Sequence, residues 1–186
     1  MNVVTSTYQP WAGDRSSALD ALLSRRSCAP KSLGDPPPSE AVLHLMIEAA
    51  VRAPDHGNLR PWRFICIQNT ARVRLGGVFA TAYMCRHRSA SRELLERERL
   101  KPLRAPMVLA VAAAMNLLKD AHILGYGGMW LTGESCHDPN VKRSLSLAPE
   151  DVIAGWIYLG TSTETPAPKQ RASANDALTH WIEATR

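Results

Sequence analysis

The sequence predicts one domain of the α+β or α/β class, in which helices surround a small central sheet. Segments with apolar residues at helical spacing outnumber the short apolar runs that resemble buried strands. A chain of 186 residues can bury one substantial core. Its apolar runs stay well short of the roughly 20 residues that a membrane-spanning helix needs. We therefore expect a single domain.

Caps, prolines and apolar spacing predict the helices. The first runs from about Ser16 to Arg25 and ends in cations, which the negative end of a helix dipole favours. The second follows Ser39, a suitable N-cap, and has to end before the next proline. Another begins with Asp138 as the N-cap and Pro139 at the first helical position. Further helices are expected at residues 71–85, 91–100, 114–125 and 174–184.

Short apolar or β-branched runs predict strands at residues 63–68, 105–113 and 151–160. No glycine, proline or polar residue marks a turn where the second of these strands gives way to a helix, at residues 112–114. A connecting segment is therefore expected to be missing there.

Several classes of chemistry lack their sequence signatures. The four cysteines are scattered without a Cys-x-x-Cys pair, which favours neither a disulfide framework nor a structural metal. The six histidines form no His-Glu-x-x-His motif, and no Gly-x-Ser-x-Gly elbow presents a serine nucleophile. The Gly-Tyr-Gly-Gly stretch follows a predicted helix, whereas a dinucleotide-binding glycine motif would follow a strand. We expect no metal site, no hydrolase triad and no Rossmann domain.

The net charge of +5 is concentrated in residues 86–104, which carry an excess of four positive charges. Such a stretch is either a solvated helix face or a patch that attracts nucleic acid or a phosphorylated cofactor. No aromatic residue lies between Arg86 and Arg104, so nucleic-acid bases would find no stacking platform. The pattern therefore does not favour nucleic acid as a partner.

Three segments carry more polar groups than packing requires. Residues 25–27, "RRS", are either surface cations at a helix end or phosphate ligands, because guanidinium groups bind phosphate oxygens in pairs. The loop "RAPDHGNLRPW", residues 52–62, either satisfies its own turns or presents donors to a ligand. The segment "GYGGMWLTGE", residues 125–134, is either a glycine C-cap before a strand with a core tryptophan or a close approach to a flat ligand.

Together and in this order, the three segments resemble the FMN-dependent nitroreductase family, most closely its compact branch of NAD(P)H nitroreductases. The shared motifs are Arg-Arg-Ser, Arg-Ala-Pro-Asp-His before Pro-Trp, and Gly-Tyr-Gly-Gly-x-Trp-x-Thr-Gly. The resemblance extends from about Ala18 to about Gly160. It implies an α+β nitroreductase-like fold and a homodimer that holds FMN at the subunit interface.

The resemblance also implies the residues that bind the phosphate end of FMN. Arg25, Arg26 and Ser27 match the ligands of the phosphate and the ribityl chain. Arg171, in a tail that matches the family poorly, would add another phosphate contact.

Residues of the other two segments match positions that contact the flavin ring. Arg52 and His56 are implied as loop contacts, and Asn58 as a hydrogen-bond partner of the pyrimidine edge. A further set would reach the FMN that is bound mostly by the other subunit; its members are Trp130, Leu131 and Thr132. No catalytic side chain is implied, because the flavin itself carries the redox chemistry.

The chain departs from the family at three places. An N-terminal extension, residues 1–15, which the compact branch usually lacks, precedes the expected single domain at residues 16–186. The junction at residues 112–114 lacks a loop and about one helix that commonly lie beside the active site. Arg60 stands where the wider family often has glutamine before Pro-Trp.

The resulting hypothesis is an FMN-dependent NAD(P)H oxidoreductase that works by a ping-pong cycle. Its acceptor would be a small molecule such as a nitroaromatic or a quinone. One alternative is a dimer that binds flavin or nucleic acid without turnover, and another is a flavoenzyme of the same fold that performs dehalogenation or flavin fragmentation. The N-terminus lacks the basic start and apolar core of a secretory signal, so the expected location is the cytoplasm.

Overall fold

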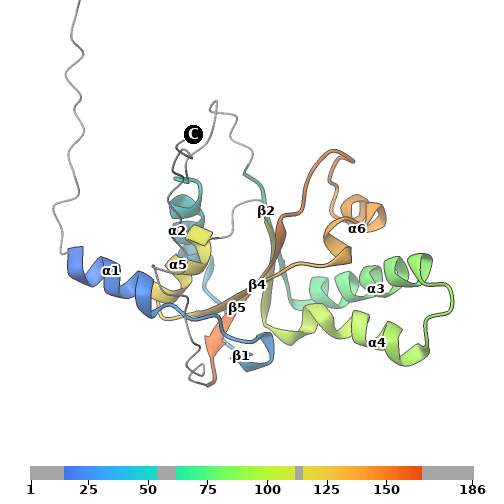
Figure 1. Ribbon diagram of the computed structural model, residues 1–186, viewed down its shortest axis with the longest axis horizontal. Helices are drawn as coiled ribbons and strands as arrows, with labels where there is room; N and C mark the ends of the chain where they lie inside the picture. Colours follow the sequence, from blue (N-terminus) through green and yellow to red (C-terminus); the bar gives the residue numbers. More distant parts are fainter. Residues whose placement is uncertain (1–14, 54–61, 112–114, 165–186) are drawn as a thin grey trace, which may run out of the picture.

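A computed structural model of the chain describes residues 15–53, 62–111 and 115–164, which form a small sheet with helices on both faces (Figure 1). The helices are α1 (Arg15–Ser24), α2 (Glu40–Ala50), α3 (Asn69–Arg86), α4 (Arg92–Leu100), α5 (Met115–Ile123) and α6 (Pro139–Ser144). The strands are β1 (Leu33–Gly34), β2 (Phe64–Gln68), β3 (Met107–Val111), β4 (Gly127–Leu131) and β5 (Gly155–Ser162). Short 3₁₀ segments are η1 (Pro30–Ser32), η3 (Lys101–Arg104) and η4 (Glu134–Cys136).

The sheet is antiparallel at each of its described strand pairs, and β5 lies in its middle. One side of β5 pairs with β3, which pairs in turn with β2. Its other side pairs with β4 and, at the far end of the strand, with β1. The antiparallel pairing assigns the domain to the α+β class, because the α/β alternative would require parallel strands joined by helical crossovers.

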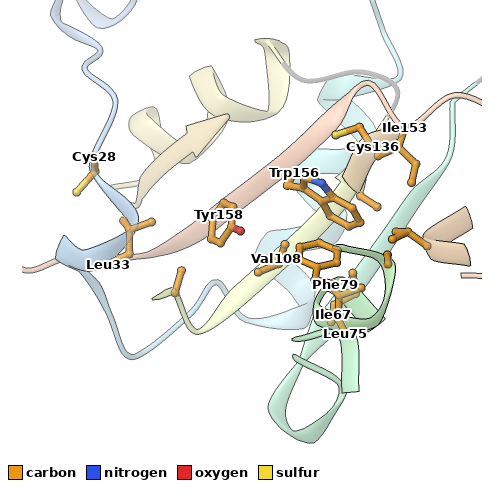
Figure 2. Packing of buried hydrophobic residues seen from close by; sticks show 14 residues of the cluster. Cys28, Leu33, Ile67, Leu75, Phe79, Val108, Cys136, Ile153, Trp156 and Tyr158 are labelled. Atoms are coloured by element: carbon orange, nitrogen blue, oxygen red, sulfur yellow. The ribbon is translucent and has the colours of Figure 1, made fainter. Parts of the chain in front are cut away.

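Alternating side chains of β5 divide the core into two layers. Ile157 and Leu159 point to one face of the sheet, where they pack against α2 and α5. Trp156 and Tyr158 point to the opposite face, as the two-residue period of a strand requires (Figure 2). There Trp156 meets Phe79 of α3 edge to face, with ring centroids 5.0 Å apart.

Local capping residues define the helix ends that the sequence predicts. The Ser39 hydroxyl accepts a hydrogen bond from the Val42 amide at 3.4 Å, which confirms it as the N-cap of α2. Asp138 caps α6 in the same way, with Pro139 at the first helical position. α6 ends at Ser144, and Ser146 adopts a positive φ of 55° that does not continue a helix.

The other helices and strands that the sequence predicts within the described residues are present, with different ends, whereas β1 was not predicted. The strand expected at residues 151–160 begins only at Gly155 and continues to Ser162. The helix expected at residues 71–85 begins earlier, at Asn69. The three residues that join β3 to α5, and the helix expected at residues 174–184, lie outside the described residues.

Candidate functional site

β4 lies within the segment of residues 125–134 and runs beside the segment of residues 25–27. Its first two glycines lie where the chain itself leaves no room for a side chain. A Cβ at Gly127 would approach Leu33 Cδ2 to 2.7 Å, and one at Gly128 would approach Leu118 Cδ2 to the same distance. These two glycines therefore allow β4 to pack closely against Leu33 on one face of the sheet and against Leu118 on the other. Gly125, with φ of 82°, provides the positive-φ residue that follows α5.

Arg25, Arg26 and Ser27 follow α1 and lie beside the start of β4. The amide of the next residue, Cys28, donates to the carbonyl of Gly128 at 3.0 Å, which anchors the segment to the strand. Arg26 is exposed, whereas Arg25 and Ser27 are half-buried and lie 3.5 Å apart, guanidinium to hydroxyl. The segment thus presents cations and a hydroxyl at one end of β4, a donor set suited to an oxyanion.

Trp130 lies toward the other end of β4 and is held in place although it is not a core residue. Trp130 is 42% exposed, which contradicts the alternative of a core tryptophan for this segment. The indole Nε1 donates to the Ala154 carbonyl at 3.2 Å. A Cβ on Gly155 would overlap Nε1 and lie 2.5 Å from Cδ1, so the ring occupies the space that this glycine leaves open. The result is a positioned aromatic ring with an accessible surface.

Strand register brings the loop at residues 52–62 toward this same end of the sheet. Phe64, the first residue of β2, pairs with Val111, which pairs with Gly155. Leu131 lies opposite the following residue of β5, Trp156. The described end of the loop, just before β2, therefore lies at the sheet end that carries Trp130 and Leu131.

The structure does not bring all the predicted residues to one point. Because a strand rises about 3.3 Å per residue, Thr132 lies roughly 13 Å along the chain from Gly128, beside which residues 25–27 lie. Arg52 is exposed just beyond α2, and Thr132 is exposed just beyond β4. The predicted site residues His56, Asn58 and Arg171 lie outside the described residues, as does Arg60.

Much of the positive charge in residues 86–104 is paired. Arg86 contacts Asp138, whose side chain is only 2% exposed, and its Nε lies 3.4 Å from Glu134 Oε2. A hydrogen bond from His87, helped by the charge of Arg86, lowers the pKa of the Glu134 carboxyl. Two local pairs neutralise further cations; they are Lys101 with Glu98 and Arg99 with Glu96. The stretch is therefore less positive in space than its sequence suggests.

The described part of the chain holds no group of three or more His, Cys, Asp or Glu side chains that could bind a metal. Within the same residues, none of the helices is both long enough and apolar enough to span a bilayer.

Sequence reasoning missed the pair formed by Gly155 and the carbonyl of Ala154, which position Trp130. A signal was present, since a glycine inside a predicted strand often marks the close approach of another group. The contact between Arg104 and Tyr158 was also missed, and no local pattern predicts it because the residues are 54 positions apart.

Comparisons with known proteins agree with this fold. Residues 22–95 match the model of the Nitroreductase family. The Escherichia coli protein named "Putative NAD(P)H nitroreductase YdjA" is 28% identical over 164 residues, which are 77% of this chain and 87% of that protein. The Bacillus subtilis protein named "Putative NAD(P)H nitroreductase YfhC" is 28% identical over 180 residues, covering 86% of this chain and 92% of the relative.

Solved structures show the same architecture. A nitroreductase-like family protein from Bacillus cereus superimposes with a TM-score of 0.73 at 18% identity, covering 97% of this chain and all (100%) of that one. The FMN-dependent nitroreductase NfnB from Mycobacterium smegmatis, solved in complex with NADPH, gives a TM-score of 0.72 at 17% identity, with 91% and 100% covered. The fold is therefore that of the nitroreductase-like α+β proteins. In sequence, the chain is similar to the Nitroreductase family over residues 22–95 and to the two named relatives from Escherichia coli and Bacillus subtilis over most of its length.

Proposed function

We propose that this protein is an FMN-dependent NAD(P)H oxidoreductase that reduces a small electron-poor acceptor such as a nitroaromatic or a quinone. The observation that carries the proposal is the layout of β4. Cations lie at one end of the strand and a positioned, half-exposed indole at the other. An elongated cofactor with a phosphate at one end and a flat ring at the other matches that layout.

The chemistry of the described residues fits FMN. Arg25 and Arg26 can bind phosphate oxygens as charged donors, and Ser27 can add a hydroxyl donor. Trp130 offers an aromatic surface, and the exposed backbone at Thr132 and Gly133 offers donors and acceptors to a polar ring edge. None of these residues has to act as an acid, a base or a nucleophile.

Bound FMN would supply the redox chemistry, accepting hydride from NAD(P)H and passing electrons to the acceptor after the first product has left. The role of the chain is to bind and orient. Residues 25–27 hold the charged end, and the hydrogen bond from Trp130 to Ala154 keeps the indole from rotating. Arg52, which the resemblance implies as a contact of the ring, would favour the reduced, more negative form of the flavin.

The proposal includes a homodimer, supported by an apolar face on α1, α2 and α5, which lie together at one side of the molecule (Figure 1). The exposed apolar residues on these helices are Leu19, Leu22, Leu23, Leu45, Met115 and Ile123. An exposed apolar surface of this kind typically marks a protein interface. A second copy placed there would cover the face and bring its own β4 toward the site.

The cofactor is tested by measuring FMN in gently purified protein after a further incubation with FMN. We expect a yellow protein whose flavin absorbance bleaches when NADPH is added without oxygen. Arg26→Met should weaken FMN binding roughly 10- to 100-fold, as loss of a charge-assisted hydrogen bond does. Arg88→Met is the matched control, because Arg88 is also exposed and lies far along the chain, beyond α3. A colourless protein that takes up no FMN would contradict the proposal.

The dimer is tested by light scattering. Leu23→Glu and Ile123→Glu should shift the protein toward the monomer, because a buried charge without a partner destabilises an interface. Val73→Glu on α3 is the control, since Val73 is 57% exposed outside that face. A wild-type protein that is monomeric at all concentrations would exclude the interface.

A further inference from the structure

A cavity of about 250 Å³ lies on the opposite face of the sheet from α2 and α5, between α3, η3 and residues 131–135. Aromatic rings form much of its wall; they belong to Phe79, Tyr83, Trp156 and Tyr158. Figure 2 shows Phe79, Trp156 and Tyr158 on this side of the sheet. Such a wall favours a flat apolar ligand, because aromatic pairs prefer offset or edge-to-face contact.

Two hydrogen-bond donors face this cavity from the same place. Arg104 Nη2 donates to the Tyr158 hydroxyl at 3.4 Å, and the guanidinium carbon lies 5.3 Å from the centre of the Tyr158 ring. Tyr158 is 2% exposed, and burial raises the pKa of its phenol, so the group keeps its hydrogen. The hydroxyl accepts from Arg104, and none of the described residues accepts from it in turn. Its own hydrogen is therefore available to a ligand.

Arg104 also carries the cavity's uncompensated charge. Arg86 and Lys101 line the wall as well, but each is paired with carboxylates, Arg86 with Asp138 and Glu134, and Lys101 with Glu98. Within the described residues, Arg104 pairs with no carboxylate; its Nε donates to the Lys101 carbonyl at 3.1 Å. Arg104 itself is exposed, and its guanidinium lies at the cavity wall beside aromatic rings, where it can bind an anion.

The size of the cavity limits the ligand. Pockets for drug-sized molecules hold about 300–1,000 Å³, so this cavity suits a single ring and not a nucleotide cofactor. Thr132 and Gly133 belong to its wall, so an occupant would adjoin the segment that we assign to the cofactor.

We infer that this cavity binds a small aromatic carboxylate, with the ring between the aromatic side chains and the carboxylate on Arg104 and the Tyr158 hydroxyl. The site is separate from the phosphate-binding residues 25–27. Its ligand is either the acceptor of the proposed reaction or an effector, and both share this chemistry.

The test is titration calorimetry on the protein as purified, with benzoate and with benzamide, an uncharged molecule of the same shape. Benzoate should bind at least about tenfold more tightly than benzamide, because only benzoate carries the charge that Arg104 recognises. Arg104→Met keeps the apolar stem and should weaken benzoate binding about 10- to 100-fold. Tyr158→Phe should weaken it less, because a neutral donor is lost.

Arg97→Met is the matched control, an exposed arginine of α4 that does not line the cavity and should leave binding unchanged. Thermal unfolding of each variant checks that the fold persists. Equal affinity for benzoate and benzamide, unchanged benzoate affinity in Arg104→Met, or no benzoate binding by the folded wild type would each overturn the inference. None of these readouts requires FMN, so they are independent of the proposed function. Turnover of 4-nitrobenzoate that Arg104→Met slows through KM would identify the ligand as the acceptor, and wild-type binding without such turnover would identify an effector.

Discussion

Replacing Gly155 by alanine would place a methyl group where the indole of Trp130 now lies. The new Cβ would overlap Nε1 of the indole, lie 2.5 Å from Cδ1 and lie 3.0 Å from the Leu131 carbonyl oxygen. The first two contacts are much shorter than van der Waals distances allow, so the ring has to move. Its movement would break the hydrogen bond from Nε1 to the Ala154 carbonyl.

The expected cost combines two effects. Overpacking by one methyl group typically destabilises a protein by about 1–3 kcal/mol when neighbours are forced to shift. The lost hydrogen bond adds about 0.5–1.5 kcal/mol at most, since the displaced Nε1 is near solvent and can bind water. We therefore expect Gly155→Ala to lower the free energy of unfolding by roughly 2–3 kcal/mol. For a chain of this size each kcal/mol corresponds to about 2–4 °C in Tm.

Denaturant unfolding measures this cost, with Gly77→Ala as the control. A Cβ on Gly77, inside α3, would meet nothing within 4 Å, and the residue has no positive φ. Alanine in a helix is favoured over glycine by about 0.5–1 kcal/mol, so the control should be neutral or stabilising. The FMN affinity of Gly155→Ala should fall as well, whereas that of Gly77→Ala should not.

The double variant Trp130→Ala with Gly155→Ala tests the cause. Once the indole is absent, the alanine at position 155 should cost much less than in the wild type, because only the contact with the Leu131 carbonyl remains. An equal cost in both backgrounds would show that the indole is not what excludes a side chain at position 155, and the positioning argument would fail.

Three further changes have defined outcomes. Asp138→Ala should destabilise the fold by about 2–3 kcal/mol in denaturant unfolding, because it removes the cap of α6 and the buried partner of Arg86, whereas Asp138→Asn keeps the cap and should cost less. Burial raises the pKa of Asp120, whose Oδ2 has no partner in the described residues, so the folded state disfavours the charged carboxylate. Asp120→Asn should therefore raise Tm near neutral pH, and the gain should disappear below about pH 3, where the carboxyl is protonated in both states. Reversing Arg97 and Arg99 to glutamate should raise the KM for NADPH at low salt, and an unchanged KM would show that the exposed face of α4 does not attract the donor.

Local signals account for most of what the sequence predicted correctly. Ser39 and Asp138 are N-caps because a short polar side chain can satisfy free amides of the first turn, a rule that needs no tertiary information. The strand run before Gln68 and the helix before Gly125 follow the same logic of apolar period and stop residue. Such features depend on neighbours within about four positions, so a reader of the sequence can find them.

The accessibility of Trp130 could not be predicted in that way. A tryptophan in a strand next to glycines is ordinarily buried, and apolar pattern alone supports that expectation. The indole is exposed because β4 pairs with β5 in a register that sets Trp130 opposite Ile157 and diagonal to Gly155, across which the ring can lie. Strand register is a property of the assembled sheet, and a shift of one residue would have turned the side chain to the other face.

The charge of residues 86–104 likewise depends on the assembled fold, because the sequence does not show which cations have a carboxylate partner. Counting charges within a sequence window assigns equal weight to every cation, but the field in a cavity depends on which cations keep a carboxylate partner. Arg86 is neutralised by Asp138 and Glu134, which lie far beyond the window in sequence. Arg104 instead donates a hydrogen bond to Tyr158, a neutral residue of the central strand β5. A single guanidinium therefore dominates this cavity although seven cations occur in the window, so substituting Arg104 should alter anion binding more than substituting any other member of the stretch.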